Sequence, residues 1–479
     1  MNLHEECGVF GIISPEPCDV SGITYYGLYA LQHRGQESCG IVVCNDGLFE
    51  SHKDLGLVSQ VFTKETLARF SKGTMAVGHV RYGTTGASNR ANCQPLEVNH
   101  QKGRMALAHN GNLTNARELR DELELSGAIF HTTSDTETIC YIVTKERLSS
   151  ASIEEAIRKA MARIEGAYSL VLLSPQKMIC ARDPKGFRPL VFGRMPDGVY
   201  VVASETCALT AVGAELVRDV RPGEILVFRK ESSGSRILVE SRTDFCDTQK
   251  KSTCIFEYIY FARPDSVIDG VPVNAARINA GRILAEEFPA DADLVIGVPD
   301  SGLDAAIGYS RQSGIPYGIG LIKNKYIGRT FISPGQDSRI NQVNIKLSAV
   351  KEAVHNKRII LIDDSIVRGT TSAHIVKLLR QAGAKEIHMR ISAPHFLHPC
   401  YYGTDIDSED QLIAVHHTDP EIAEYIGADT LGFLPVGRLS ELIGSSEFCS
   451  ACFDGHYPSA IPSDTRKDRF EQKLSEIRK

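Results

Sequence analysis

The sequence lacks the features that direct a protein into a membrane, onto nucleic acid or along a secretory route. No apolar stretch approaches the roughly 20 residues that span a bilayer, and no run of basic residues forms a stripe, the formal net charge being −6. The N-terminus is short and acidic, unlike a signal or transit peptide. Internal repeats and low-complexity tracts are also missing. We therefore expect a cytoplasmic protein with no nucleic-acid partner and no membrane partner.

Cysteine is plentiful, and the expected compartment decides how it is interpreted. The chain has 13 cysteines among 479 residues. Thiols stay reduced in the cytoplasm, so most should be small buried hydrophobic residues, and one with a function is usually a nucleophile or a metal ligand. The composition, with 42% hydrophobic and 23% charged residues, is typical of a globular protein, and the length predicts two or three domains.

The N-terminal part predicts packed sheets with helical layers. Short apolar runs at 7–13, 75–80, 169–173 and 198–203 are typical of buried strands. Two helical stretches interrupt them, at about 116–125 and 153–165. Residues from about 230 to 252 are polar, charged and without periodicity, so we place a domain boundary there. The predicted domains are 7–235 and 250–479.

Beyond that boundary, strands and helices alternate. Strands are expected at 294–298, 359–362 and 386–391, and helices at 274–288 and 372–381. Such alternation is the signature of a parallel α/β sheet.

Cys7 opens the first expected strand, and taken alone it is best explained as core packing. Four later segments change that interpretation: QHRGQES at 32–38, HVRYGTTG at 79–86, AHNGNL at 108–113 and TSDTE at 133–137. Each has an ordinary explanation by itself, a turn for Asn110-Gly111 or a surface ion pair for Arg81. Together and in this order they resemble the glutaminase domain of the N-terminal-nucleophile amidotransferases.

This resemblance implies a role for each matching residue. In that family the cysteine is the first residue of the mature chain, so Cys7 would be the nucleophile and its own α-amine the base. The Asn110 side chain and the Gly111 N–H would form the oxyanion hole. Arg81 would hold the α-carboxylate of glutamine, and Asp135 its α-ammonium group. Six residues precede Cys7, so cleavage after Glu6 would release residues 1–6 as a propeptide.

A second candidate site follows the strand expected at 359–362. Asp363 and Asp364 come next, then a loop of small residues and a helix, the place where open α/β sheets bind ligands. Backbone N–H groups, hydroxyls and the helix N-terminus can cradle a sugar 5-phosphate, while the acids suit ribose hydroxyls and Mg²⁺. The plain alternative is an acidic helix start. The string at 359–371 resembles the fingerprint of type I phosphoribosyltransferases, which implies that phosphoribosyl pyrophosphate binds Asp363, Asp364, Ser365, Arg368, Gly369, Thr370 and Thr371.

Two further segments fit the same resemblance. The strand at 294–298 ends in a tight turn, where backbone amides could meet pyrophosphate and Ser301 could reach the magnesium ion. The basic segment at 323–330 matches a family loop that closes over the substrate, which makes Lys323 and Arg329 candidate ligands. A strand-to-helix turn and a solvated basic loop are the plain alternatives.

Four cysteines match metal ligands. Cys449 and Cys452 form a C-x-x-C motif, which is weak evidence alone because it is common by chance. Cys254 and Cys400 match the remaining ligands of the iron–sulfur branch of the family. Four thiolates suit either zinc or a [4Fe–4S] cluster, and the resemblance favours one [4Fe–4S] cluster. We expect its role to be structural, with oxygen sensing as the alternative.

Taken from residue 7 to about 457, the chain is identified as similar to the amidophosphoribosyltransferase family. The implied fold is an α+β N-terminal-nucleophile hydrolase sandwich (glutaminase) followed by an α/β type I phosphoribosyltransferase domain. The implied reaction is the first step of purine biosynthesis, in which glutamine and phosphoribosyl pyrophosphate give 5-phosphoribosylamine, glutamate and pyrophosphate. Purine nucleotides are expected as feedback inhibitors, and the chain as a homo-oligomer, tetramer or dimer. The alternatives are a regulatory protein that binds phosphoribosyl pyrophosphate and a paralogue with glutaminase activity alone.

Overall fold

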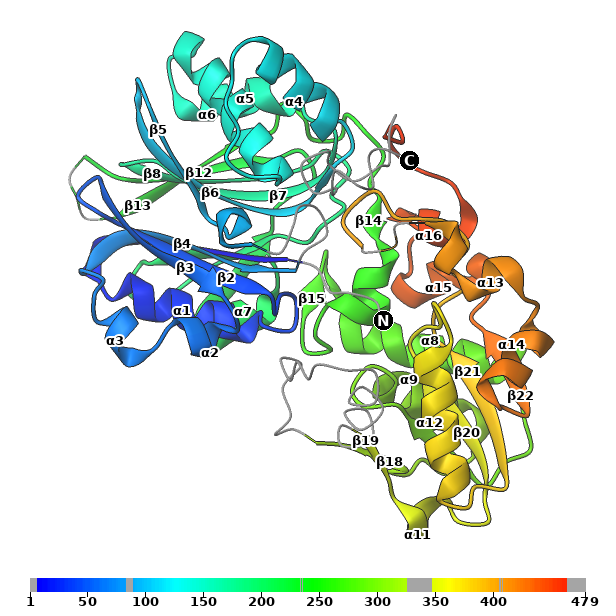
Figure 1. The fold of residues 1–479 in the computed structure, drawn as a ribbon. Coiled ribbons are helices and arrows are strands. Elements are labelled where there is room, and N and C mark those ends of the chain that lie inside the picture. Colours follow the sequence, from blue (N-terminus) through cyan, green and yellow to red (C-terminus); the bar gives the residue numbers. More distant parts are fainter. Residues whose placement is uncertain are drawn as a thin grey trace.

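The computed structural model describes residues 7–82, 89–232, 234, 236–324, 347–404, 406 and 408–462. Two parts follow one another along the chain (Figure 1): two stacked antiparallel sheets between helices, and then a parallel sheet with helices around it. We call them the first and the second half. The predicted propeptide, residues 1–6, lies outside the described residues, as does Arg329.

Both sheets of the first half are antiparallel throughout. The seven-stranded sheet has the order β11 (Glu215–Asp219), β9 (Val191–Arg194), β10 (Tyr200–Ala203), β1 (Gly8–Cys18), β4 (Gly73–Arg81), β2 (Ser38–Asn45) and β3 (Leu48–Leu55). The six-stranded sheet has the order β13 (Ile237–Arg242), β12 (Ile225–Lys230), β8 (Lys177–Arg182), β7 (Gly166–Leu173), β6 (Gly103–Leu113) and β5 (Leu96–His100).

Strand β1 shows how the sequence builds these layers. Successive strand residues point to opposite faces. Val9 and Ile13 accordingly enter the apolar layer between the two sheets, while Phe10 and Ile12 enter the layer between the seven-stranded sheet and its helices. Because both faces are covered, β1 is almost continuously apolar, the pattern of a fully buried strand.

Helices cover the outer face of each sheet (Figure 1). The seven-stranded sheet carries α1 (Val20–Ala30), α2 (Val58–Val61), α3 (Lys64–Leu67) and α7 (Thr206–Ala211). The six-stranded sheet carries α4 (Ala116–Leu125), α5 (Asp135–Ser149) and α6 (Ile153–Met161). A short 3₁₀ turn, η1, spans Arg90–Asn92.

The sequence prediction missed five of these helices and extended another too far. The helices α1, α2, α3, α5 and α7 were not expected, and α6 ends at Met161 before the predicted residue 165. Helix α1 contains glycine and β-branched residues, which are poor helix formers, so packing stabilises it. A Cβ added to Gly27 would lie 2.2 Å from the Phe10 ring, so this contact requires glycine.

The region 230–252 was expected to be irregular, and this expectation was wrong. It contains β13, which pairs with β12 from Ile225↔Arg242 to Lys230↔Ile237. The six-stranded sheet therefore continues beyond residue 235. The strand was not recognised because β13 is an edge strand with only Ile237 buried, so most of its side chains are polar or charged.

The second half is built on a parallel sheet, as the alternating pattern predicts. Its order is β17 (Leu294–Gly297), β20 (Arg358–Asp363), β21 (Glu386–Ile391) and β22 (Thr430–Phe433). The main helices are α8 (Val273–Glu287), α9 (Leu303–Ser313), α12 (Thr370–Gln381) and α14 (Asp419–Ile426). One large apolar core joins the sheet to these helices.

Short elements complete the second half. Three two-stranded ladders pair β14 (Thr253–Cys254) with β23 (Phe448–Cys449), β15 (Val267–Ile268) with β16 (Val271–Pro272), and β18 (Leu321–Lys323) with β19 (Leu347–Ala349). The short helical turns are η2 (Glu257–Phe261), α11 (Lys351–Val354), η3 (Glu409–Gln411), α13 (Ile413–His416), η4 (Val436–Arg438), α15 (Ser440–Ile443) and α16 (Ala451–Asp454). Within the described ranges, no helix has the length and apolar character needed to cross a bilayer.

Candidate functional site

Cys7 lies immediately before β1, at the end of the seven-stranded sheet where β4 finishes. Pairing of Gly8 with Val80 places Cys7 beside Tyr82, whose carbonyl oxygen accepts a bond from the Cys7 Sγ at 3.5 Å. The side chain is buried. The candidate nucleophile therefore sits at a strand end, where its main chain leads out of the sheet.

Asn110 and Gly111 lie on β6 of the other sheet. Both polar atoms of the Asn110 side chain are buried and have no hydrogen-bond partner among the described residues. A buried amide without partners is costly, and few native side chains remain in that state. Gly111 has a φ of +139°, and a Cβ there would lie 2.1 Å from the Ala167 carbonyl oxygen. Asn110 thus offers an unsatisfied donor beside a backbone that only glycine can form.

A histidine contact joins the strand ends that carry these residues. His79 of β4 places Nε2 3.0 Å from the carbonyl oxygen of His109 on β6. Burial lowers the pKa of His79 to about 3, so its ring is neutral. Because a carbonyl oxygen only accepts, Nε2 carries the proton. This bond brings the segment of Arg81 against the segment of Asn110.

Arg81 and Asp135 are both buried beside these strands. Arg81 binds Glu37 at 2.9 Å. Asp135, the first residue of α5, accepts the Leu113 N–H at 3.0 Å and lies 3.5 Å from His109 Nδ1. Burial alone would raise the pKa of Asp135, but His109 and the backbone N–H groups hold it below its usual value. The carboxylate therefore stays ionised next to β6, the strand that carries Asn110.

Asp363 and Asp364 stand where β20 ends in the second half. Ser301 donates to one Asp364 oxygen at 2.8 Å, and Ser365 donates to the other at 2.7 Å. Burial, followed by the adjacent negative charge of Asp364, raises the pKa of Asp363 well above its usual value. Two adjacent buried acids repel one another, and a divalent cation would offset that repulsion. The donor set fits Mg²⁺, which takes one or two carboxylates together with substrate phosphates and water.

The neighbouring candidate residues frame this acidic pair. Gly369 is the N-cap of α12 with a φ of +76°, so the loop from Ser365 turns directly into a helix N-terminus. Thr370 and Thr371 are exposed in the first turn of that helix, and Arg368 is half-buried. Lys323, at the end of β18, reaches Asp300 at 2.5 Å, next to Ser301. Of the predicted basic segment 323–330, residues 325–330 lie outside the described residues.

The four candidate metal-ligand cysteines also come together. Cys254 pairs with Cys449 across the β14–β23 ladder. The Cys452 thiol has a pKa raised well above its usual value, first by burial and then by Cys400, Cys254 and Cys449. The backbone N–H of Tyr402 donates to Cys400 Sγ at 3.4 Å. The other three cysteines therefore lie close enough to Cys452 to affect its pKa.

In the part of the chain that the structure describes, no three or more His, Cys, Asp or Glu side chains are arranged to hold a single metal ion. Such an arrangement would be needed to bind one metal ion. In an iron–sulfur cluster each cysteine binds a different iron, so the four sulfurs need not meet at one point. A set made only of thiols, brought together from four positions, still fits such a cluster.

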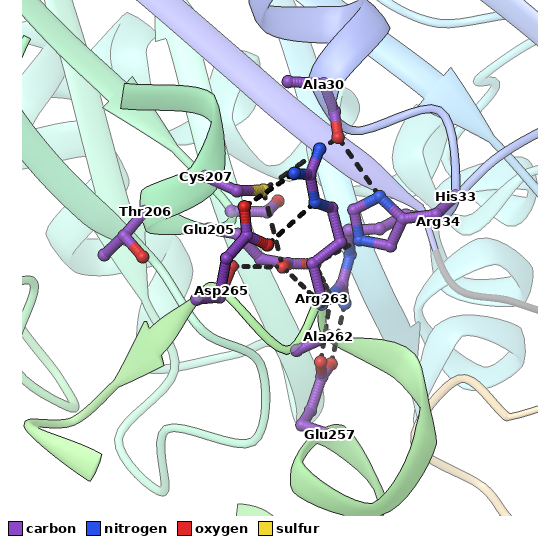
Figure 2. Close-up of polar contacts among 12 residues, drawn as sticks. Ala30, His33, Arg34, Glu205, Thr206, Cys207, Glu257, Ala262, Arg263 and Asp265 are labelled. Atoms are coloured by element: carbon purple, nitrogen blue, oxygen red, sulfur yellow. Dashed lines mark hydrogen bonds and ion pairs between the residues drawn. The ribbon is translucent and has the colours of Figure 1, made fainter. Parts of the chain in front are cut away.

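A buried ion network joins the two halves, and sequence reasoning gave its members no role. Arg34 donates through Nε to the Cys7 carbonyl oxygen at 3.0 Å. Its terminal nitrogens bind Glu257 at 2.9 and 2.7 Å and Glu205 at 2.7 Å (Figure 2). Arg188 lies 3.3 Å from Glu257. All four charged side chains are completely shielded from solvent, two cations balancing two anions.

Glu205 belongs to the first half but binds the second. It accepts the Ser266 hydroxyl at 2.7 Å and the Arg263 backbone N–H at 2.9 Å. Burial alone would raise the pKa of Glu205, but His33, Arg34 and Ser266 hold it far below the usual value. Residues 32–38 and 256–266 are far apart in the sequence, and nothing in either segment indicates that the two meet.

The segment after Cys400 rests on the first half as well. The Tyr402 carbonyl oxygen accepts from Arg188 at 2.7 Å, and the Tyr401 carbonyl oxygen accepts from Asn112 at 3.0 Å. The Phe187 and Tyr402 rings stack with centroids 4.2 Å apart. The cysteine-bearing segment is therefore fixed two residues along β6 from Asn110.

A second buried ion pair crosses the same boundary without touching Cys7. Arg182 donates to both oxygens of Asp269, at 2.8 and 3.1 Å. Thr253 adds a bond to Asp269 at 2.9 Å, and Lys251 lies 3.0 Å away. Burial alone would raise the pKa of Asp269, but Arg182 and Lys251 hold it far below its usual value.

Comparisons with known proteins agree along the whole chain. A family model described as a glutamine amidotransferase domain matches residues 79–211. The amidophosphoribosyltransferase of Bacillus subtilis is 48% identical over 470 residues, which cover 97% of this chain and 96% of that protein. That of Methanocaldococcus jannaschii is 46% identical over 463 residues, covering 95% and 98%.

Two solved structures are similar over the same extent. One is glutamine phosphoribosylpyrophosphate amidotransferase from B. subtilis complexed with ADP and GMP, with 48% identity, a TM-score of 0.87 and coverage of 96% of this chain and 99% of that chain. The other is described as the allosteric regulatory enzyme of purine biosynthesis, with 47% identity, a TM-score of 0.89 and coverage of 98% and 100%.

The ion pairs at the boundary predict a loss of stability in acid. Glu205, Glu257 and Asp269 have folded pKa values below their unfolded values of roughly 3.9–4.3. Their stabilisation is therefore complete above that range and is lost as the pH falls through it toward the folded values. Asp269→Asn should lower the free energy of unfolding by about 3–5 kcal/mol at neutral pH and flatten its decline below about pH 4.5. Urea unfolding across pH measures this.

The matched control is Asp410→Asn, which changes an exposed carboxylate. It should leave the acid part of the stability curve unchanged. Equal curves for Asp269→Asn and the parent protein would contradict the assignment of Asp269 to this acid transition.

Proposed function

Because the chain belongs to the amidophosphoribosyltransferase family, we propose that Cys7 is the nucleophile of its glutaminase half and that Asp363 and Asp364 organise its transferase site. The enzyme converts phosphoribosyl pyrophosphate to 5-phosphoribosylamine with glutamine as the nitrogen donor, releasing glutamate and pyrophosphate, in purine biosynthesis. The observation that best supports the glutaminase role is the Asn110 side-chain amide, which is buried and has no hydrogen-bond partner among the described residues.

Glutamine hydrolysis begins with attack of the Cys7 thiolate on the side-chain amide carbon. We propose that residues 1–6 are removed first, because only then does Cys7 have an α-amine, with a pKa of roughly 7.7–8.0, to take the thiol proton. The C–N bond breaks as the amine returns that proton to the leaving ammonia. Water then hydrolyses the thioester to glutamate.

The oxyanion of each tetrahedral intermediate would lie between the Asn110 side chain and the Gly111 N–H. Both donors are fixed before substrate arrives, and Asn110 loses no other hydrogen bond by donating. Arg81 would bind the α-carboxylate of glutamine through its planar fork. Asp135, held ionised by its neighbours, would bind the α-ammonium group.

Ammonia replaces pyrophosphate at the anomeric carbon in the second half. Asp363 and Asp364 would hold the ribose hydroxyls and Mg²⁺, with Ser301 reaching the same ion. When bound, Mg²⁺ neutralises charge on the departing pyrophosphate. Gly369 exposes the N-terminus of α12, which suits the 5-phosphate. The further proposed contacts are Ser365, Arg368, Thr370, Thr371, Lys323 and Arg329.

Cys254, Cys400, Cys449 and Cys452 would hold one [4Fe–4S] cluster. Burial, and then the neighbouring Cys400, Cys254 and Cys449, raise the pKa of the Cys452 thiol, and bound iron would stabilise the thiolates. Such a cluster would supply cross-linking, since it joins positions nearly 200 residues apart. We further propose a cytoplasmic location, a homo-oligomeric assembly and feedback inhibition by purine nucleotides. The ADP and GMP in the similar B. subtilis structure support the last point.

Cys7→Ala should abolish the use of glutamine and spare the use of ammonia. Loss of a covalent nucleophile reduces such reactions by a factor on the order of 10⁶, while the ammonia-dependent rate should stay within about twofold. Steady-state pyrophosphate release with each nitrogen donor measures both, and intact-mass analysis should show that active parent enzyme begins at Cys7. Cys44→Ser changes another buried thiol and serves as the control. Parallel loss of both activities in folded protein would count against two sites.

Asp363→Asn with Asp364→Asn should disable the transferase site. The missing carboxylates cost several kcal/mol of charge stabilisation, so ammonia-dependent kcat/KM should fall by about 100-fold or more and require more Mg²⁺. Basal glutamine hydrolysis should persist. Asp291→Asn with Asp293→Asn removes two acids near the start of β17, where they bind Arg358, and should leave these kinetics unchanged. Equal kinetics for the two double variants would refute the assignment.

Cys452→Ser and Cys400→Ser should each give colourless protein that is deficient in iron and sulfide and unfolds at lower temperature. Cys18→Ser alters a half-buried thiol on β1 and should leave brown protein with normal iron content. Absorbance, iron and sulfide analysis and thermal unfolding of anaerobically purified protein measure these effects. Zinc in place of iron and sulfide in the parent protein would exclude the cluster.

A further inference from the structure

Arg34 reaches from the candidate nucleophile to the second half of the molecule, where it meets Glu257 (Figure 2). Its Nε holds the Cys7 carbonyl oxygen at 3.0 Å, and its terminal nitrogens meet both oxygens of Glu257 at 2.7 and 2.9 Å. A guanidinium group is planar and rigid, so the direction of Nε is set by the partners of the other two nitrogens. Glu257 therefore helps to determine where the Cys7 main chain lies.

Glu257 is itself firmly held within the second half. It is the first residue of η2, a single π-helical turn that begins three residues after Cys254. Arg277 of α8 donates to three carbonyl oxygens of that turn, those of Tyr258, Tyr260 and Ala262, at 2.6 to 3.0 Å. The turn that carries Glu257 is therefore fixed to α8 of the second half.

We propose that Arg34 and Glu257 form an interdomain clamp that positions Cys7 for attack on glutamine. Glutamine use then depends on an ion pair across the boundary, whereas ammonia use does not. Arg34 and Glu257 are positioning residues, since neither is assigned a contact with substrate. This inference rests on the proposed role of Cys7. A nucleophile displaced by about 1 Å loses on the order of 100-fold in rate, so a modest reorientation of Arg34 would suffice.

The competing explanation is that the pair only holds the two halves together. Arg182 and Asp269 provide a matched comparison, because they form a second buried, two-pronged ion pair across the same boundary. Arg182 binds backbone carbonyl oxygens of Val220, Gly186 and Arg188, and the structure gives it no bond to Cys7. Breaking either pair should weaken the boundary, but only the first should disturb the nucleophile.

The experiment compares Glu257→Gln with Asp269→Asn in the full-length enzyme. For Glu257→Gln we expect kcat with glutamine to fall by about 10- to 100-fold, KM for glutamine to change by less than about threefold, and the ammonia-dependent rate to stay within about twofold. Alkylation of Cys7 by iodoacetamide should slow together with kcat. Asp269→Asn should change the glutamine and ammonia rates by one common factor.

Two conservative variants separate positioning from folding. Glu257→Asp keeps the charge with a shorter arm and should recover part of the lost kcat. Arg34→Lys keeps the charge but offers one nitrogen, so it cannot hold Cys7 and both carboxylates and should resemble Glu257→Gln. If Glu257→Gln does not fold, Glu257→Asp and Arg34→Lys should still show the selective loss of glutamine use.

The proposal is overturned if Glu257→Gln and Asp269→Asn affect glutamine and ammonia rates alike, or if the folded Glu257 and Arg34 variants retain full kcat with glutamine. Cys7→Ala distinguishes this failure from failure of the nucleophile assignment. If Cys7→Ala still used glutamine, the assignment would be wrong. If it lost glutamine use while the clamp variants did not, only the clamp would be wrong.

Discussion

The buried charges of Arg34, Arg188, Glu205 and Glu257 set the constraint on which the two-part structure depends. None is exposed to solvent, so each lost its hydration on folding and must recover it from its neighbours. Removing one member of such a set typically costs about 3–5 kcal/mol, because a charge is left buried alone. The halves therefore fit together in the one arrangement that satisfies all four charges.

The same boundary also collects the segments nearest the chemistry. The Cys7 carbonyl oxygen accepts a hydrogen bond from Arg34, and the Tyr402 carbonyl oxygen accepts one from Arg188. The segment that follows Cys400 also contacts the first half, through Asn112 and Phe187. Loosening that segment would therefore disturb β6, where Asn110 lies.

Contiguous patterns were predictable, and distant contacts were not. The strand, acids, glycine and helix around Asp363 are adjacent in sequence, so their geometry follows from local rules. Family resemblance located the residues around Asn110. Arg34 and Glu257, by contrast, are 223 residues apart, and no periodicity indicates that they meet. Helix α5 was missed for a related reason: eight of its residues are buried, including Asp135 and Glu137, so it shows no clear apolar stripe.

The candidate sites and the boundary between the halves differ in how well their polar groups are paired. Among the described residues the Asn110 side chain has no hydrogen-bond partner, and Asp363 lies beside the charge of Asp364. Both candidate sites are therefore in an unfavourable state that a ligand would relieve. The ion network between them is fully paired. A polar group fixed in place before the reaction needs no reorganisation when charge develops, but only a rigid support keeps it there. The paired boundary supplies that rigidity to the Cys7 main chain through Arg34, so residues remote from substrate can govern how the nucleophile acts.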